Sequence, residues 1–231
     1  MNMTSAGLIL KQIEMGPMMN FVYIIGCAET REAAVIDPAW DVSAILRTAG
    51  ELGLRLRHIL VTHGHPDHVN GLEELLDVTD AKTYLNEAEL GYLSEMGKFF
   101  QVSVDFLKRR AGNIQLVSDD EEIQVGKILV RCLHTPGHTP GSQCFLIGKT
   151  LFSGDTLFVD ACGRVDLPGG DVEKMWWSLN RKLRALGDDI ILYPGHNYGR
   201  QPTSTLGEQK RSNPYMQFDS PDEFLRAMGA C

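Results

Sequence analysis

Metal-binding residue types are concentrated in the stretch VTHGHPDHVNG, residues 61–71. The chain has seven histidines, and three of them lie here beside an aspartate, as His63, His65, Asp67 and His68. Packing gives no reason to place so many polar groups within six residues, because each must find a partner if it is buried. The preceding run RHILV predicts a buried strand that ends where the cluster begins. Loops that follow strands are common places for binding sites, so this stretch predicts one.

Three other loops follow the same arrangement, in which a strand is followed by Gly or Pro and then by a metal-binding residue type. LHTPGHTPGS carries His138, FSGDTLF carries Asp155 and LYPGHNYG carries His196. Glycine permits tight turns, so that side chains from different strand ends can converge. His134 precedes the turn of its loop, and we expect it to pack or to donate to the backbone. His58 lies outside these loops and is expected at the surface or at the start of a strand.

The spacing within the first cluster predicts two neighbouring metal sites. His63 and His65 are two residues apart, so on an extended segment they point to the same side and can serve one metal. Asp67 and His68 follow Pro66, where the chain must turn, and can face a second metal.

The three remaining loops can complete this pair of sites. His138 can complete the first site, His196 can complete the second, and Asp155 can bridge the two. Imidazole with a few carboxylates suits zinc first, with iron or manganese as alternatives. Two divalent ions roughly 3.5–4 Å apart can hold a bridging hydroxide at neutral pH. Asp67 is expected to orient that hydroxide and to take its proton.

Composition limits the class of protein and its partners. The chain has 231 residues, is 43% hydrophobic and carries a net charge of −8, with a pI of about 5.3. Bulk neutralisation of nucleic-acid phosphates is therefore not expected. The five cysteines form no CxxC motif and predict no disulfide framework. No signal peptide and no bilayer-spanning run is evident, so we expect a cytoplasmic protein that acts on a small molecule as a monomer or homodimer.

Hydrophobic patterning predicts a single domain over 1–231 that alternates strands and helices. Asp41 and Asp171 are predicted helix N-caps, and hairpin turns are predicted at Gly126-Lys127 and Gly148-Lys149. Residues 204–231 are predicted to form a short helical tail. Strands in two groups, one on each side of a central helical stretch, predict two packed sheets with helices outside. The predicted strands are 8–13, 19–27, 33–38, 57–61, 115–119, 121–125, 127–135, 143–148, 149–154 and 189–194, and the longer helices are 41–52, 71–78, 86–96 and 171–187.

The four loops resemble the motifs of the metallo-β-lactamase superfamily. THGHPDH, TPGHTPG, SGDTLF and PGHNYG occur in that order within a similarity that runs from about Phe21 to Pro214. The resemblance implies an αββα sandwich of two mixed sheets with a dinuclear metal site at one edge. As the spacing also predicts, the resemblance assigns one metal to His63, His65 and His138 and the other to Asp67, His68 and His196, with Asp155 bridging the two. The pairing of Asp67 with His68 is unlike that of true β-lactamases, so antibiotic hydrolysis is not expected.

Two further segments resemble glyoxalase II-like hydrolases and persulfide dioxygenases, both of which act on glutathione derivatives. These are ACGRVDLPGGD, residues 161–171, and STLGEQKRSNPYM, residues 204–216. The resemblance makes Arg164 a candidate contact for a glutathione carboxylate, which suits its two-pronged guanidinium. A salt bridge between Arg164 and Asp166 is the alternative. About 35 residues follow His196, so the helical domain by which long glyoxalase II enzymes bind glutathione is not expected here.

Three functions are compatible with these residues. The first is a dinuclear metallohydrolase that cleaves a glutathione-type thioester, as in hydroxyacylglutathione hydrolases. The second is a persulfide dioxygenase with one iron on His63, His138 and Asp155. The third is a binding protein with an inactive site. The hydrolase is preferred because all seven ligands are present, and the inactive protein is ranked last because none has been lost.

Overall fold

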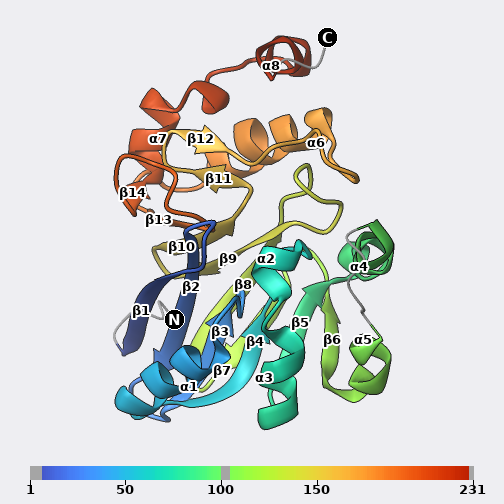
Figure 1. The fold of residues 1–231 in the computed structure, drawn as a ribbon. Helices are drawn as coiled ribbons and strands as arrows, with labels where there is room; N and C mark the ends of the chain where they lie inside the picture. The colour runs from blue at the N-terminus through green and yellow to red at the C-terminus, as the bar shows by residue number, and fades with distance from the viewer. Residues whose placement is uncertain (1–6, 100–104, 229–231) are drawn as a thin grey trace.

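The computed structural model describes residues 7–99 and 105–228, in which two six-stranded sheets pack together with helices on both outer faces (Figure 1). The first sheet has the spatial order β1 (Leu8–Met15), β2 (Asn20–Cys27), β3 (Glu32–Ile36), β4 (Arg55–Leu60), β5 (Lys82–Asn86) and β6 (Ile114–Val117). The second has the order β14 (Ser204–Thr205), β13 (Ile191–Pro194), β10 (Thr150–Gly154), β9 (Gln143–Ile147), β8 (Ile128–His134) and β7 (Glu122–Val125).

The helices fall on the two outer faces and in the connections. Those before the second sheet are α1 (Val42–Glu51), α2 (Pro66–Val69), α3 (Leu72–Val78), α4 (Glu87–Phe99) and α5 (Phe106–Arg109). Those after β10 are α6 (Val172–Trp177), α7 (Leu206–Ser212) and α8 (Pro221–Ala227), and a small ribbon pairs β11 (Leu157–Phe158) with β12 (Ala161–Cys162). In the described part of the chain, no helix is both long and apolar enough to cross a membrane.

Strand β2 explains why the sheets form a sandwich, because all eight of its residues are buried. Val22 and Ile24 pack into the cluster that includes helices α1 and α3. Phe21, Tyr23 and Ile25 point the other way, into the core between the sheets. A third apolar cluster lies between the second sheet and helices α6, α7 and α8. Both sheets contain parallel and antiparallel pairs, so the predicted αββα sandwich is confirmed.

Sheet topology gathers particular strand ends at one edge of the sandwich. Strands β3 and β4 are parallel neighbours, and so are β10 and β13. Strand β8 is antiparallel to β9, which is antiparallel to β10, so β8 and β10 run in the same direction. Strand β2 runs against β3 and therefore brings its amino end to the edge where β3 ends. The loops that carry the candidate ligands follow β4, β8, β10 and β13.

Local signals for caps and turns are confirmed. Asp41 accepts a hydrogen bond from the Ala44 amide at 2.8 Å, and Asp171 accepts one from the Lys174 amide at 3.0 Å. The hairpin turns at Gly126 and Gly148 have φ of +58° and +56°, a region that glycine enters without strain.

Two predictions about strands are wrong. Strand β5 was not predicted, because Lys82–Asn86 is short and leads directly into helix α4. Strand β6 follows the central helices but joins the first sheet, where it pairs in parallel with β5. Sheet membership depends on this long-range pairing, which the order of elements along the chain does not specify.

The helix predicted over 171–187 changes its winding partway along. An α-helical segment ends at Trp177, a wider π-type turn covers Ser178–Lys182, and a 3₁₀ turn ends at Ala185. The side chains of Met175, Leu179 and Leu183 are all fully buried. Because they are four residues apart, the wider turn keeps all three on one face.

Two histidines outside the cluster have structural roles. The Nε2 atom of His134 lies 2.9 Å from the carbonyl oxygen of Pro140, which confirms the expected bond to the backbone. His58 was expected at a surface or strand start, but it lies buried within β4, which begins at Arg55. Its ring nitrogens contact Glu32 at 2.6 Å and Tyr84 at 3.3 Å, on the two neighbouring strands.

Candidate metal centre

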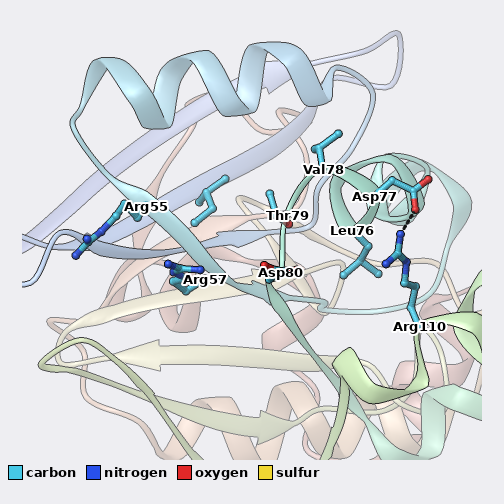
Figure 2. Close-up of a pocket in the computed structure, with 9 residues that line it drawn as sticks. Arg55, Arg57, Leu76, Asp77, Val78, Thr79, Asp80 and Arg110 are labelled. Atoms are coloured by element: carbon cyan, nitrogen blue, oxygen red, sulfur yellow. Dashed lines mark hydrogen bonds and ion pairs between the residues drawn. The ribbon is translucent and has the colours of Figure 1, made fainter.

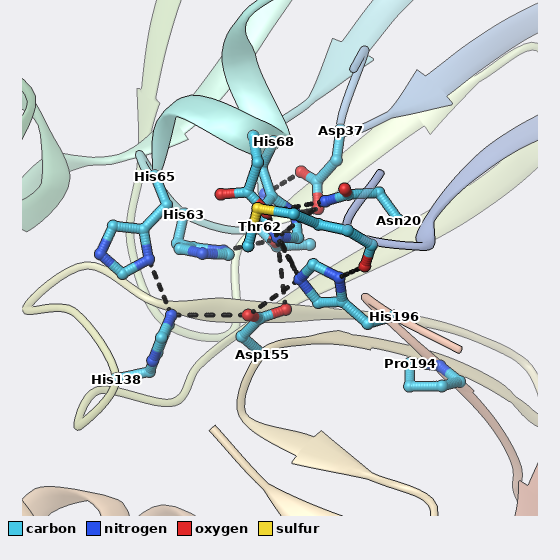
Figure 3. A network of polar contacts seen from close by, with 12 residues as sticks. Asn20, Asp37, Thr62, His63, His65, His68, His138, Asp155, Pro194 and His196 are labelled. Atoms are coloured by element: carbon cyan, nitrogen blue, oxygen red, sulfur yellow. Dashed lines mark hydrogen bonds and ion pairs between the residues drawn. The ribbon is translucent and has the colours of Figure 1, made fainter. Parts of the chain in front are cut away.

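The structure brings all seven predicted ligands into one largely buried cluster at the edge of the sandwich. Figure 3 shows the histidines of this cluster around Asp155. Four come from the loop and short helix after β4, and three come from loops of the second sheet. The cluster therefore lies where the two sheets meet. Its members are His63, His65, Asp67, His68, His138, Asp155 and His196.

Three imidazoles form the first half of the cluster. The ligand atoms of His63, His65 and His138 lie within 4.8 Å of one another. The Nδ1 atom of His65 is 2.8 Å from the Nε2 atom of His138. This is the trio that the spacing assigns to the first metal.

A second trio lies beside the first. The ligand atoms of Asp67, His68 and His196 also lie within 4.8 Å of one another, and the Nε2 atoms of the two imidazoles are 3.0 Å apart. Asp155 lies between the trios, with Oδ2 3.6 Å from His138 Nε2 and Oδ1 3.4 Å from His68 Nε2. A carboxylate in this position can face two metal ions at once.

Hydrogen bonds on the outer side of the rings decide which nitrogen faces the centre. The Nδ1 atoms of His138 and His196 donate to the carbonyl oxygens of Arg164 and Met18, at 2.7 and 2.8 Å. A carbonyl can only accept, so the hydrogen must sit on these outer nitrogens. The inner Nε2 atoms of both rings then present lone pairs to the centre.

Hydrogen-bond acceptors also hold the ring hydrogens of His63 and His68 on their outer nitrogens. Asp37 accepts from His68 Nδ1 at 3.0 Å and from the Thr62 hydroxyl at 2.6 Å. The Thr62 hydroxyl hydrogen is thus committed to Asp37, so its oxygen accepts from His63 Nδ1, 3.0 Å away. Partners of this kind orient metal-binding histidines in general.

In the neutral rings, the converging lone pairs favour a bound cation. His68 and His196 approach each other at 3.0 Å through two nitrogens that both lack a hydrogen in the neutral rings. His63 Nε2 and Asp155 Oδ1 are buried and have no hydrogen-bond partner, which is costly unless something else satisfies them. Imidazole nitrogens with carboxylate oxygens match the donor preferences of zinc and iron. The residues present therefore fit divalent metal.

Electrostatics differ between the two halves. Burial lowers the pKa of His63 and lowers that of His65 to about 3, and His138 adds to the effect on His65, so these rings are neutral. Burial also acts against protonation of His68, but Asp155 and Asp37 outweigh it and raise its pKa to about 10. The pKa of Asp155 is lowered despite burial, because His68 and His196 face it. The second half is thus the more anionic one and favours positive charge.

Asn20 and Trp40 support Asp67, and the sequence did not predict them as site residues. The Asn20 amide donates to Asp67 Oδ2 at 2.9 Å, and the Trp40 indole N–H donates to Asn20 Oδ1 at 2.8 Å. The second bond fixes the amide so that its NH₂ faces the carboxylate. Position 20 reaches the site because β2 starts at the edge where β3 ends, which single-strand patterning does not reveal.

Glu89 joins the two loops of the first trio. This fully buried carboxylate accepts from the amide of Gly64 at 2.5 Å, the amide of Gly141 at 2.7 Å and the hydroxyl of Thr139 at 2.9 Å. Tyr92, one turn later on α4, places its hydroxyl 2.8 Å from His65 Nε2. An acidic residue on the same helical face as Tyr92 is the signal that could have identified Glu89 from sequence.

Arg164 lies beside the site through its backbone, while its side chain points elsewhere. Its carbonyl oxygen accepts from His138, and its guanidinium holds Asp166 through two bonds of 2.6 and 2.7 Å. The neighbouring Gly163 must lack a side chain, since a Cβ there would lie 1.9 Å from the Asp155 carbonyl oxygen. Contact of Arg164 with a substrate carboxylate stays a prediction, and it requires release from Asp166.

A cleft of about 460 Å³ lies at the start of β4, at the opposite end of that strand from the ligand loop (Figure 2). Arg55, Arg57 and Arg110 line it, and Asp77 and Asp80 offset their charge. Arg110 is already paired with Asp77 at 2.5 Å. The cleft shares no residue with the metal cluster.

Comparison with known proteins agrees with this geometry. The family model described as "Metallo-beta-lactamase superfamily" matches residues 15–196. The "Probable polyketide biosynthesis zinc-dependent hydrolase PksB" of Bacillus subtilis (strain 168) is 32% identical over 90% of this chain and 86% of its own length. The "Hydroxyacylglutathione hydrolase GloC" of Haemophilus influenzae is 36% identical over 83% of this chain and 91% of its own.

A solved structure resembles the whole described fold. The crystal structure of ETHE1 from Myxococcus xanthus has a TM-score of 0.80 and 30% identity, and it covers 96% of this chain and 90% of its own. ETHE1 is also the name of mitochondrial persulfide dioxygenases. Similar proteins therefore include both hydrolases and a dioxygenase.

Proposed function

This chain belongs to the metallo-β-lactamase superfamily, and from that membership and the geometry of its site we propose that it is a metal-dependent thioester hydrolase. The observation that carries the proposal is the complete second trio, Asp67, His68 and His196, beside the first. A dinuclear hydrolase requires all three of these ligands, whereas the single-iron alternative uses His63, His138 and Asp155.

The two trios divide the work of holding metal. His63, His65 and His138 would hold one ion, Asp67, His68 and His196 would hold the other, and Asp155 would face both. When bound, two divalent ions supply a hydroxide at neutral pH and polarise a carbonyl group. The similarity to PksB, which is named as a zinc-dependent hydrolase, supports zinc as the first ion to test.

Asp67 is the residue of the site that is best placed to handle a proton. Its side chain is 15% exposed, so it can be reached from solvent, and Asn20 holds one of its oxygens. It orients the attacking water and accepts its proton. Water then adds to the thioester carbonyl carbon and the C–S bond breaks, which yields a carboxylic acid and a thiol. A thiolate leaves readily, so the chain needs no strong general acid beside the sulfur.

A glutathione thioester is the first substrate to test, because GloC is named as a hydroxyacylglutathione hydrolase. We expect the zinc-loaded protein to release glutathione from S-lactoylglutathione in the absence of oxygen, with two metals per chain. His68→Ala should abolish the activity, because it removes a ligand of the second trio. Absence of thiol release from any thioester by protein with two metals per chain would contradict the proposal.

Persulfide dioxygenase is the second candidate, and the likeness to ETHE1 favours it. It would use one iron on His63, His138 and Asp155, a set of two histidines and one carboxylate that leaves positions open for oxygen. Oxygen uptake with glutathione persulfide separates the two activities. A dioxygenase would consume oxygen with one iron per chain, would not work with zinc, and would tolerate loss of His196.

A further inference from the structure

Exposed apolar side chains gather at one side of the metal centre. Of the ten large apolar or aromatic side chains that are exposed in the described part of the chain, four belong to this neighbourhood. We call them the apolar rim: Met18, Met19, Trp40 and Tyr198, which are 45%, 40%, 37% and 47% exposed.

Three of the four rim residues contact the second trio or the residue that supports it. The carbonyl oxygen of Met18 accepts from His196, and the ring of Tyr198 stacks on His196 with centroids 4.5 Å apart and planes 7° from parallel. Trp40 donates to Asn20, the residue that holds Asp67. The rim therefore lies along the side of the site formed by Asp67, His68 and His196.

The segments that carry the rim residues are neighbours in the structure. The turn that carries Met18 and Met19 begins at Gly16, and a Cβ on Gly16 would lie 2.4 Å from the indole of Trp40. The indole therefore packs directly on this turn, which only glycine at position 16 permits. On the other side, the amide of Asn197 donates to the carbonyl of Met19 at 2.9 Å, which ties the turn to the segment that carries Tyr198.

Two rim residues hold an unfavourable backbone conformation. Met19 has φ of +53° and Trp40 has φ of +64°. Such conformations in residues other than glycine are unfavourable and persist only where the surroundings impose them. Strained backbone clusters at functional sites, and grouped exposed apolar side chains are typical of binding surfaces.

The neighbouring cations are already neutralised. Arg164 holds Asp166, and Arg200, four residues after His196, is paired with Asp160 at 3.2 Å and with Glu208 at 2.6 Å. The side of the site that the rim occupies thus offers apolar contact in place of free positive charge. Its occupant should be uncharged hydrocarbon.

We infer that the apolar rim receives the acyl group of the thioester substrate and that this group is a hydrocarbon chain. The inference rests on the proposed hydrolase activity. A thioester bound with its carbonyl at the metal centre extends its acyl group on one side and its thiol on the other. Each buried methylene contributes about 0.8 kcal/mol at full burial. On a half-exposed rim this corresponds to about a twofold to threefold gain in kcat/KM per methylene.

The test is a series of acetyl, butanoyl and hexanoyl thioesters, made both on glutathione and on N-acetylcysteamine. For the wild-type protein loaded with zinc, we expect kcat/KM to rise at least tenfold from acetyl to hexanoyl on both thiols. Met18→Ser with Met19→Ser, and separately Tyr198→Ser, should reduce this rise to threefold or less. Leu116→Ser and Trp177→Ser change exposed apolar residues of similar exposure elsewhere and should keep the full rise.

The inference is overturned if kcat/KM of the wild type does not rise from acetyl to hexanoyl thioesters. It is also overturned if both rim variants keep the full rise. Binding of S-methyl and S-hexyl thioethers of glutathione, measured by calorimetry, separates this failure from failure of the hydrolase proposal, since thioethers are not cleaved. One outcome is that the wild type, but not the rim variants, binds the S-hexyl thioether more tightly than the S-methyl thioether while no thioester is cleaved. That result would support the apolar rim as a binding surface and reject the hydrolase proposal. Equal binding of the two thioethers would reject the rim whatever the outcome of the hydrolysis assay.

Discussion

Each imidazole of the ligand cluster has its outer nitrogen engaged by a neighbour, and four of these neighbours force the hydrogen outward. Carbonyl oxygens do this for His138 and His196, Asp37 does it for His68, and Thr62 does it for His63. The inner lone pairs then repel one another until a cation occupies the space between them. The ligand residues are therefore arranged for metal before it binds, which lowers the cost of binding.

Removal of one ligand tests the first trio. We expect His138→Ala to lose most of its bound metal while it stays folded, because the ring belongs to the site and not to an apolar core cluster. Metal content after purification, measured by plasma emission spectroscopy, and far-UV circular dichroism are the two readouts. His134→Ala is the matched control, since that ring bonds to the carbonyl of Pro140 and belongs to neither trio. Full metal content in His138→Ala would remove this residue from the ligand set.

The role of Asp67 is tested by Asp67→Asn. An amide is a poor metal ligand and cannot take a proton, so turnover should fall at least about a hundredfold while the fold survives. Steady-state kinetics on the best thioester provide the measurement. Asp189→Asn, at an exposed aspartate that pairs with Lys149, is the control and should retain normal turnover. Near-normal thioester turnover in Asp67→Asn would show that this carboxylate neither holds an essential metal nor takes the proton of the attacking water.

Support of Asp67 by Asn20 and Trp40 can be measured with a double-mutant cycle. Asn20→Ala should lower kcat/KM about tenfold to a hundredfold, as is usual for partners of metal ligands. Trp40→Phe keeps an aromatic ring and removes only the N–H, so its loss should be smaller. In the Asn20→Ala background the same change should have no further effect. Additive losses would contradict the idea that Trp40 acts through Asn20.

At the scale of elements, helix α4 connects two loops that lie far apart in the sequence. Glu89 bonds the loop after β4 through Gly64 and the loop after β8 through Thr139 and Gly141. Burial raises the pKa of this carboxyl from 4.5 to about 7, although its three hydrogen bonds act in the opposite direction. The two ligand loops are thus held together by one side chain that changes charge near neutral pH.

The shifted pKa predicts how stability depends on pH. The folded-state pKa of Glu89 exceeds the unfolded value, so the protonated carboxyl favours the folded state. This stabilisation is complete below about pH 4.5 and is lost as the pH rises through 7. The wild type should therefore lose stability relative to Glu89→Gln between pH 5 and 8, by at most about 3 kcal/mol. Urea unfolding of both proteins across this range measures the difference. The control Glu74→Gln, at an exposed position, should show the same dependence of stability on pH as the wild type. A wild type that gains stability relative to Glu89→Gln as the pH rises would refute the raised pKa of Glu89.

At the scale of the whole molecule, the metal centre joins the two sheets. His63, His65, Asp67 and His68 come from the first sheet, and His138, Asp155 and His196 come from the second. Without metal, the carboxylates and inner nitrogens face one another at the edge where the sheets meet. Metal binding should therefore stabilise the packing of one sheet against the other.

Chelation tests this stabilisation. Complete removal of metal should lower the melting temperature by about 5–15 °C. Bound metal contributes several kcal/mol to stability, and each kcal/mol shifts the melting temperature of a chain of this size by about 2–4 °C. Differential scanning calorimetry before and after chelation measures the change. Zinc should restore the original value and magnesium should not, since magnesium prefers oxygen ligands. An unchanged melting temperature in protein verified to be metal-free would show that the sheets do not depend on the site.

The sequence by itself determined the ligand cluster, the helix caps, the hairpin turns and the layered fold class. These features depend on residues close together in the chain: the spacing in HGHPDH, the caps at Asp41 and Asp171, and Gly at turns. Convergence of the four loops could also be predicted, because each follows a strand and such loops carry sites.

Only the tertiary structure decided which side chains surround that cluster. Asn20 reaches Asp67 across 47 residues of sequence, Glu89 reaches Gly141 across 52, and His68 meets His196 across 128. These contacts depend on which strands are neighbours and in which direction they run. The parallel pairing of β5 with β6, which local pattern did not predict, illustrates the same dependence. Local propensity specifies an element and its ends, whereas its neighbours are selected by burial of its apolar faces against distant parts of the chain.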